Sequence, residues 1–210
     1  MLLNFEKIYK DYKMDIRGIL HIGAHYGQEY KVYKEHEIKN IMFFEPLEKN
    51  FLVLEENMQN EPGVALVKKA LGNQNSEVRM YVESDNQGQS SSVLMPRKHL
   101  VQYPHIRFHE TELVEMVKLD DFLKPPERKK YNFINIDVQG YELEVFKGST
   151  EILNNIDYII SEVNRDDLYF KCARVEEIDE FLEPYGFIRV ETNWEGHTWG
   201  DALYVRGATC

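Results

Sequence analysis

An α/β fold, with a mostly parallel sheet covered by helices on both faces, is the fold class that this sequence predicts. Short, nearly continuous apolar runs alternate with segments of helical periodicity along the chain, which is typical of parallel strands buried on both faces. The 210 residues carry no internal repeat and no linker rich in Pro, Gly and Ser. We therefore expect one domain over residues 1–210, which includes an N-terminal helix at about 1–14.

The predicted elements follow one another in a regular order. The spacing of Leu2, Phe5, Ile8 and Tyr12 predicts an amphipathic first helix. Apolar runs predict central strands at 18–22, 41–45, 64–69, 133–137 and 158–163, and more polar strands of an edge or flap at 78–82 and 113–118. Helical spacing predicts helices up to about 35 and at 47–58, 141–153 and 175–183, and a terminal antiparallel hairpin is expected at 187–191 and 202–206.

The formal net charge of −11 argues against two classes of partner. A negative field repels phosphate backbones and anionic membrane surfaces, so we expect neither nucleic acid nor membrane to be bound. The local basic run Arg128-Lys129-Lys130 is interpreted as a solvated loop.

Cysteine content and apolar runs predict the compartment. Cys172 and Cys210 form no metal-ligand or redox motif, which suits a reducing environment. Lys171 and Arg174 would lower the pKa of Cys172, but an inert surface thiol is the favoured interpretation. The sequence contains neither an apolar run of the roughly 18–20 residues needed to cross a bilayer nor a signal-peptide core, so we expect a cytoplasmic protein.

The end of the first predicted strand is a candidate ligand-binding turn, because open parallel sheets bind ligands beyond the carboxyl ends of their strands. Gly23 and Gly27 bracket a tight turn into a helix within the run from His21 to Glu29. Glycine there allows unusual backbone angles and close approach to a ligand. The spacing matches neither the dinucleotide fingerprint nor a Walker loop, and a structural turn without a ligand remains the alternative.

The second predicted strand ends in Glu45-Pro46. A carboxylate here can accept both hydroxyls of a ribose, and its position 22 residues after Gly23 suits an acid one β-α-β unit later. A glutamate favoured by the dipole of the next helix is the alternative. The pairing with the glycine turn favours a nucleoside site.

A third acid, Asp137, follows the buried strand at 133–137. It could lie beside a cationic sulfonium or act as a base, whereas a helix N-cap is the structural alternative. We favour the functional interpretation because Asp137, Glu45 and the glycine turn are expected to converge on one crevice.

Taken together, these motifs resemble those of the FkbM-type methyltransferase family. The order and spacing match over residues 18–206, nearly the whole chain. The matching stretches are His21-Ile22-Gly23-Ala24-His25 with Gly27-Gln28-Glu29, Glu45-Pro46, Leu119-Asp120-Asp121-Phe122, the run from Ile136 to Val145 with Lys147-Gly148, and Trp199-Gly200-Asp201-Ala202.

The resemblance implies a class I methyltransferase fold, which is Rossmann-like: a seven-stranded, mostly parallel sheet with one antiparallel strand and helices on both faces. It implies S-adenosylmethionine as cofactor and a small-molecule acceptor, with O-methylation of a sugar or another hydroxyl. Carried over to this sequence, it places Gly23, Ala24 and Gly27 at the methionine and ribose, Glu45 with Pro46 at the ribose hydroxyls, Ala70 and Leu71 at the adenine, Ser91 and Ser92 in a loop beside the cofactor, Asp137 at the methionine amine or sulfonium, and Glu162 and Asp201 on the substrate side.

His21 departs from the pattern, since this position often carries an aspartate that helps to hold the cofactor's ammonium. We expect Glu29 or Asp137 to take over that contact. His21 is kept among the candidate cofactor residues, with a hydrogen-bonded core histidine as the alternative.

A hydroxyl acceptor must lose its proton, and the candidate catalytic residues are Asp137, His197 and Glu162. His197 lies in the aromatic, glycine-rich segment 194–201, which either closes over the substrate or is an ordinary hairpin loop. Carboxylates such as the Asp120-Asp121 pair suit magnesium or calcium, but Leu119-Asp120-Asp121-Phe122 predicts a helix start. We predict no required metal.

Two other functions compete with a methyltransferase. One is a non-catalytic module that binds S-adenosylmethionine or a nucleoside and regulates a partner. The histidine at position 21, where an aspartate is common, favours this alternative. The other is a nucleotide-dependent oxidoreductase, which the absent dinucleotide glycine spacing disfavours.

Overall fold

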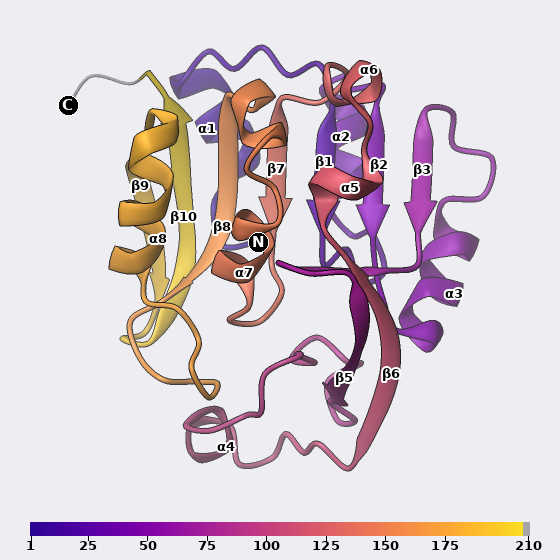
Figure 1. Ribbon diagram of the computed structural model, residues 1–210, viewed down its shortest axis with the longest axis vertical. Coiled ribbons are helices and arrows are strands. Elements are labelled where there is room, and N and C mark those ends of the chain that lie inside the picture. Colours follow the sequence, from indigo (N-terminus) through magenta and orange to yellow (C-terminus); the bar gives the residue numbers. More distant parts are fainter. Residues whose placement is uncertain (208–210) are drawn as a thin grey trace.

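The computed structural model describes residues 1–207, and Cys210 lies outside them. Its centre is a seven-stranded sheet in the order β3-β2-β1-β7-β8-β10-β9 (Figure 1). Only β10 runs antiparallel to its neighbours, which confirms the predicted sheet. The strands are β1 (Ile19–Ile22), β2 (Ile41–Phe44), β3 (Val64–Val67), β7 (Phe133–Ile136), β8 (Tyr158–Asn164), β9 (Phe187–Glu195) and β10 (Trp199–Arg206).

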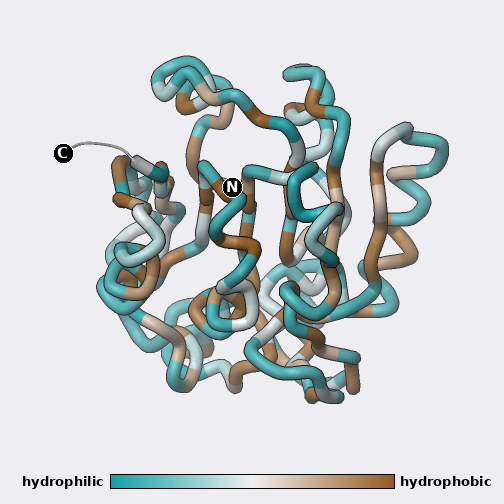
Figure 2. Tube along the Cα trace, turned by 45° about the horizontal axis from the view of Figure 1, so that its top comes forward, coloured by the Kyte–Doolittle hydropathy of each residue, from teal (hydrophilic) through white to brown (hydrophobic). Residues whose placement is uncertain are grey.

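Helices cover both faces of this sheet because the strand residues point alternately to each side. In β1, Leu20 and Ile22 pack in the core with α5, α7 and α8, whereas Ile19 packs in the core with α1, α2 and α3. Figure 2 shows the hydrophobic residues concentrated along the central strands and the hydrophilic ones on the outer loops. The helices are α1 (Phe5–Asp11), α2 (Tyr30–Glu35), α3 (Glu48–Asn57), α5 (Leu119–Phe122), α7 (Glu142–Lys147) and α8 (Val175–Leu182).

A small second sheet, β4-β6-β5, is built from the polar strands that we expected at an edge or flap. The connection between β5 and β6, residues 83–109, is called the flap here; it carries α4 and lies beyond the C-terminal ends of the central strands (Figure 1). Ion pairs join Arg97 to Asp167 and Lys98 to Asp166. The elements are β4 (Ala70–Leu71), β5 (Ser76–Val82), α4 (His99–Gln102), β6 (Glu110–Val117) and, after α5, α6 (Pro125–Arg128).

The helix predicted at 141–153 is split in two. α7 ends before Gly148, where a Cβ atom would lie 1.9 Å from the carbonyl oxygen of Gly72. The chain resumes as the 3-10 helix η1 (Ile152–Asn155), whose first N–H groups are accepted by the Asp120 carboxylate. The break is set by this close approach between distant segments. Periodicity reports only local spacing, so it predicted one continuous helix.

The C-terminal hairpin is longer than predicted. β9 and β10 pair up to Glu195 and Trp199, so most of the segment 194–201 is strand and only 196–198 form the turn. α8 ends one residue early and passes into a 3-10 turn, η2 (Glu183–Tyr185), which contains Pro184.

Two residues that the sequence placed on the surface are buried, whereas Lys129 and Lys130 are exposed as expected. Arg128 is buried, and its guanidinium donates to the carbonyl oxygens of Leu123 and Asp120, so it holds a loop rather than facing solvent. Cys172 is also buried, and burial raises the pKa of its thiol, contrary to the lowering expected from Lys171 and Arg174. Within residues 1–207, no helix has the length and apolar composition required to cross a bilayer.

Candidate functional site

A cavity of about 290 Å³ opens where β1, β2 and β7 end. The ends of these three strands, which carry Gly23, Glu45 and Asp137, therefore lie around one cavity, as we expected for a parallel sheet. The predicted cofactor residues that line this cavity are His21, Gly23, Ala24, Glu29, Glu45, Pro46, Ala70, Leu71, Ser91 and Asp137.

The turn after β1 needs glycine at position 23. Gly23 has φ of +80°, and a Cβ atom there would lie 1.8 Å from the carbonyl oxygen of Asp137. The N–H groups of Gly23 and Ala24 both donate to the carbonyl oxygen of Phe44 at 2.9 Å. The turn is thereby fixed between the ends of β2 and β7, and its backbone forms one wall of the cavity.

Glu45 is a buried carboxylate that is held by backbone N–H groups. Its two oxygens accept from the N–H groups of His25 and Leu47, each at 2.9 Å, and only 5% of the residue is exposed. Burial raises the pKa of Glu45 to about 7, against the opposing effect of these hydrogen bonds. Its fixed position and its remaining lone pairs suit it to accept hydrogen bonds from a ligand diol.

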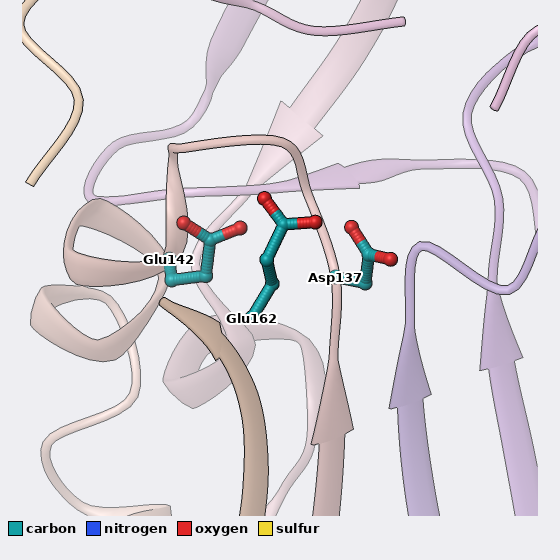
Figure 3. Close-up of side chains that lie close together, drawn as sticks. All are labelled: Asp137, Glu142 and Glu162. Atoms are coloured by element: carbon teal, nitrogen blue, oxygen red, sulfur yellow. The ribbon is translucent and has the colours of Figure 1, made fainter. Parts of the chain in front are cut away.

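Acidic side chains continue from this cavity across three neighbouring strands. The register pairs Ile136 of β7 with Ser161 of β8, which sets Asp137 beside Glu162, and Glu162 pairs with Asp201 of β10. We call Asp137, Glu162 and Asp201 the acidic row. Figure 3 shows the carboxyl groups of Glu142, Glu162 and Asp137 side by side, with Glu162 in the middle. One oxygen atom from each of these three lies within 4.8 Å of the others.

An amide group lies between two members of the row. Gln139 Nε2 donates to Asp137 Oδ1 at 2.8 Å and to Glu162 Oε2 at 2.7 Å, and Gln139 Oε1 lies 2.7 Å from the hydroxyl of Tyr169. Glu142 instead accepts N–H groups of the 138–140 turn. Each of these carboxyl groups therefore accepts at least one hydrogen bond from the chain itself.

Charge differs along the acidic row. Burial and the neighbouring carboxylates of Asp137 and Glu142 raise the pKa of Glu162 well above its usual value, which favours its protonated form. The side chain of Asp137 is exposed and lines the cavity. A protonated Glu162 is a poor proton acceptor, which leaves Asp137 as the better candidate base.

His21 combines the two roles considered for it. It lines the cavity, yet its Nδ1 lies 3.2 Å from the hydroxyl of Tyr33, and that hydroxyl accepts from Asn135 Nδ2 at 2.7 Å. Burial lowers the pKa of His21, so the ring is neutral. Glu29 also lines the cavity, and its carboxylate lies 3.6 Å from the amino group of Met1.

Four predicted site residues do not line the cavity. Gly27 packs against Met58, the residue after α3, and Ser92 donates its hydroxyl to the carbonyl oxygen of Gln139. Glu162 is buried behind Asp137 and Gln139. His197 is exposed on the β9–β10 turn.

Asn50 and Gln139 are two of the lining residues that the sequence analysis did not place in the site. Asn50 is 4% exposed and lies beside Glu45; the signal was a polar residue on the apolar face set by Leu47 and Leu54. Gln139 gave no comparable signal, because it meets Glu162, 23 residues later in the sequence, only when β7 and β8 pair.

Comparison with known families gives a match over most of the chain. A family model described as the methyltransferase FkbM domain matches residues 21–189. The 2-O-methyltransferase NoeI of Sinorhizobium fredii is 28% identical over 158 residues, which are 72% of this chain and 65% of that protein. The hexuronic acid methyltransferase AglP of Haloferax volcanii is 25% identical over 126 residues, 60% of this chain and 47% of that protein. The aligned region spans less than two thirds of each of these relatives.

Solved structures share the fold at much lower identity. Streptococcus pneumoniae Sp1610 in complex with S-adenosyl-L-methionine, a candidate tRNA (m1A22) methyltransferase, aligns with a TM-score of 0.54 at 12% identity, over 100% of this chain and 75% of that one. A protein in the NADB-Rossmann superfamily from Streptococcus agalactiae aligns with a TM-score of 0.53 at 8% identity, over 100% and 71%. At these identities the likeness concerns the fold alone.

Proposed function

The chain belongs to the FkbM methyltransferase family, and we propose that it transfers the methyl group of S-adenosylmethionine to a hydroxyl group of a sugar. The observation that carries the proposal is the meeting of Gly23, Glu45 and Asp137 in one cavity at the ends of three parallel strands. The names of the two curated relatives support a sugar acceptor, since one is a 2-O-methyltransferase and the other a hexuronic acid methyltransferase.

The cavity fits this cofactor in the chemistry of its walls. Glu45 would accept the ribose hydroxyls, and the backbone of the Gly23-Ala24 turn would hold the methionine part. Apolar Ala70 and Leu71 are buried at the cavity wall and would pack on the adenine. When bound, the cofactor supplies an electrophilic methyl group on a positively charged sulfur.

The chain's own contribution to the reaction lies beside Asp137. Its carboxylate would accept the proton of the acceptor hydroxyl, while the Gln139 amide fixes one of its oxygens at 2.8 Å. The raised pKa of Glu162 disfavours a second negative charge next to the base. The flap, through Gly88, Gln89 and Ser91, forms a further wall that excludes water.

Calorimetry with S-adenosylmethionine, S-adenosylhomocysteine and NAD tests the cofactor. We expect the first two to bind and NAD not to bind. Failure of the first two to bind would overturn the proposal, and tight NAD binding would favour the oxidoreductase alternative.

Methyl transfer from S-adenosylmethionine to a panel of methyl glycosides, followed by mass spectrometry, tests the acceptor. We expect a mass gain of one methyl group on at least one glycoside. Cofactor binding with no transfer to any of them would favour a binding module instead of an enzyme.

A further inference from the structure

Asn164, the last residue of β8, is fully buried, and neither Oδ1 nor Nδ2 of its amide has a hydrogen-bond partner among residues 1–207. We propose that this amide is part of the acceptor subsite and binds adjacent hydroxyls of a neutral sugar. The inference rests on the proposed function and extends it by naming where the acceptor binds and what charge it carries.

The strand register sets Asn164 two residues along β8 from Glu162, the middle member of the acidic row. Side chains alternate along a strand, so Asn164 lies on the same face as Glu162. In the neighbouring strand, Glu162 pairs with Asp201 and Asn164 pairs with Trp199. Two residues of strand, about 7 Å, therefore separate the amide from the carboxyl group beside the candidate base. That spacing matches the width of one sugar ring.

An unpartnered buried amide is unusual, because it has lost its hydrogen bonds to water without replacement. This chain satisfies a comparable amide elsewhere. Asn132, 1% exposed, accepts from the N–H of Arg17 at 2.7 Å and donates to the carbonyl oxygen of Asp15 and to Asp157, each at 2.8 Å. Asn132 precedes β7, at the edge of the sheet opposite the cavity. The missing bonds at Asn164 point to a ligand that supplies them.

The flap is bound to two segments near Asn164, the start of β10 and the chain after β8. Tyr103 of the flap accepts a hydrogen bond at 2.9 Å from the indole N–H of Trp199, the residue paired with Asn164. In the chain after β8, the carbonyl oxygen of Leu168 accepts from the N–H of Arg97 at 2.8 Å. An acceptor would reach the amide when residues 96–103 lift from these contacts, which include the ion pairs of Arg97 and Lys98 and the packing of the His99 ring against Tyr169.

The chemistry of the subsite selects its ligand. A primary amide offers two donors and one acceptor, and two adjacent sugar hydroxyls can pair with both ends of it. Trp199 adds an aromatic surface of the kind that lines small-molecule sites. Asp137 and Asp201 bring negative charge to the same row, which disfavours an anionic acceptor such as a hexuronate.

Paired variants test the role of the amide. Asn164→Leu replaces an unpartnered amide by an apolar group of the same branched shape, so its Tm should rise by about 2–4 °C. Asn132→Leu, the matched control, breaks three bonds and should lower the Tm by about 4–8 °C. Asn164→Ala serves in the same comparison if the leucine variant does not accumulate.

Binding is then measured by calorimetry on protein saturated with S-adenosylhomocysteine, with methyl hexosides, methyl 6-deoxyhexosides and methyl hexuronides as probes. We expect a neutral glycoside to bind the wild type and to bind Asn164→Leu at least about 10-fold more weakly. S-adenosylhomocysteine should bind both proteins equally, within about twofold.

Each other outcome is decisive. Equal glycoside affinity in the wild type and Asn164→Leu, or a Tm lowered as far as in Asn132→Leu, overturns the subsite. Preference for the hexuronide, or no glycoside binding, overturns the neutral sugar. Glycoside binding that depends on Asn164 without methyl transfer leaves the subsite in place and contradicts the proposed function alone.

Discussion

We call the cavity the cofactor half of the proposed site, and the buried residues Glu162 and Asn164 beside it the acceptor half. The two halves satisfy their polar groups in different ways. On the cofactor half, Gly23 and Glu45 are fixed by backbone hydrogen bonds within the chain itself. On the acceptor half, Glu162 is buried among like charges, and the amide of Asn164 has no partner in residues 1–207. The contrast indicates that the first half is preorganised by local turns, whereas the second keeps unsatisfied polarity that a bound acceptor would satisfy.

The largest expected effect is on the preorganised half. Gly23→Ala would force a Cβ atom against the Asp137 carbonyl oxygen in a left-handed conformation, so we expect at least about 4 kcal/mol of destabilisation and loss of S-adenosylmethionine binding. Chemical denaturation and calorimetry measure both.

The control for that variant is Gly196→Ala, since Gly196 also has positive φ, of +58°, but has no atom within 4 Å of a Cβ. It should cost only the backbone strain, about 1–2 kcal/mol. Equal losses in the two variants would show that the contact with Asp137 is not what shapes the turn.

Asp137→Asn tests the boundary between the halves. It keeps the shape and the contact with Gln139 but removes the proton acceptor, so kcat should fall by about 10²–10⁴-fold. Affinity for S-adenosylhomocysteine should change much less. An unchanged kcat would assign proton removal to another group, and a large loss of cofactor affinity would place Asp137 on the cofactor half alone.

Stability against pH reports the buried acids of both halves. The pKa values of Glu45 and Glu142 are raised to about 7, and that of Glu162 is raised well above its usual value. Their folded-state pKa values exceed the unfolded ones. Protonation of these groups therefore stabilises the folded protein fully below about pH 4.5, and this stabilisation is lost as pH rises through about 7. A shift from 4.5 to about 7 corresponds to about 3 kcal/mol.

The Tm should therefore fall between pH 5 and pH 8, by about 6–12 °C for each 3 kcal/mol that is realised. Glu162→Gln should flatten this dependence more than Glu45→Gln does, because Glu162 lies among other carboxylates. The exposed Glu56→Gln is the control and should follow the wild type. A wild-type Tm that rises over this range would contradict the protonation assigned to these groups.

The same contrast explains what sequence reasoning could predict. Gly23, Glu45 and Asp137 follow directly after strands, so local patterns together with the rule for parallel sheets were enough to bring them to one cavity. Asn164 and Gln139 depend on the pairing of distant segments, which a local pattern does not encode. The break at Gly148 has the same origin, because it is set by contact with Gly72.

The smallest expected effect concerns the ribose contact of the cofactor half. Glu45→Gln keeps the side-chain volume but loses the charge and one of two acceptor oxygens, so S-adenosylmethionine should bind about 10-fold more weakly. An ionised carboxylate is the better acceptor for ribose hydroxyls, and the pKa of Glu45 in the free protein is about 7. Wild-type affinity should therefore strengthen between pH 6 and pH 8. The cofactor's own amino group can titrate in this range, but it contributes equally to the glutamine variant. Calorimetry at several pH values on both proteins isolates the part due to Glu45. Identical slopes in the two proteins would remove Glu45 from the ribose and would leave the cofactor half defined by its backbone alone.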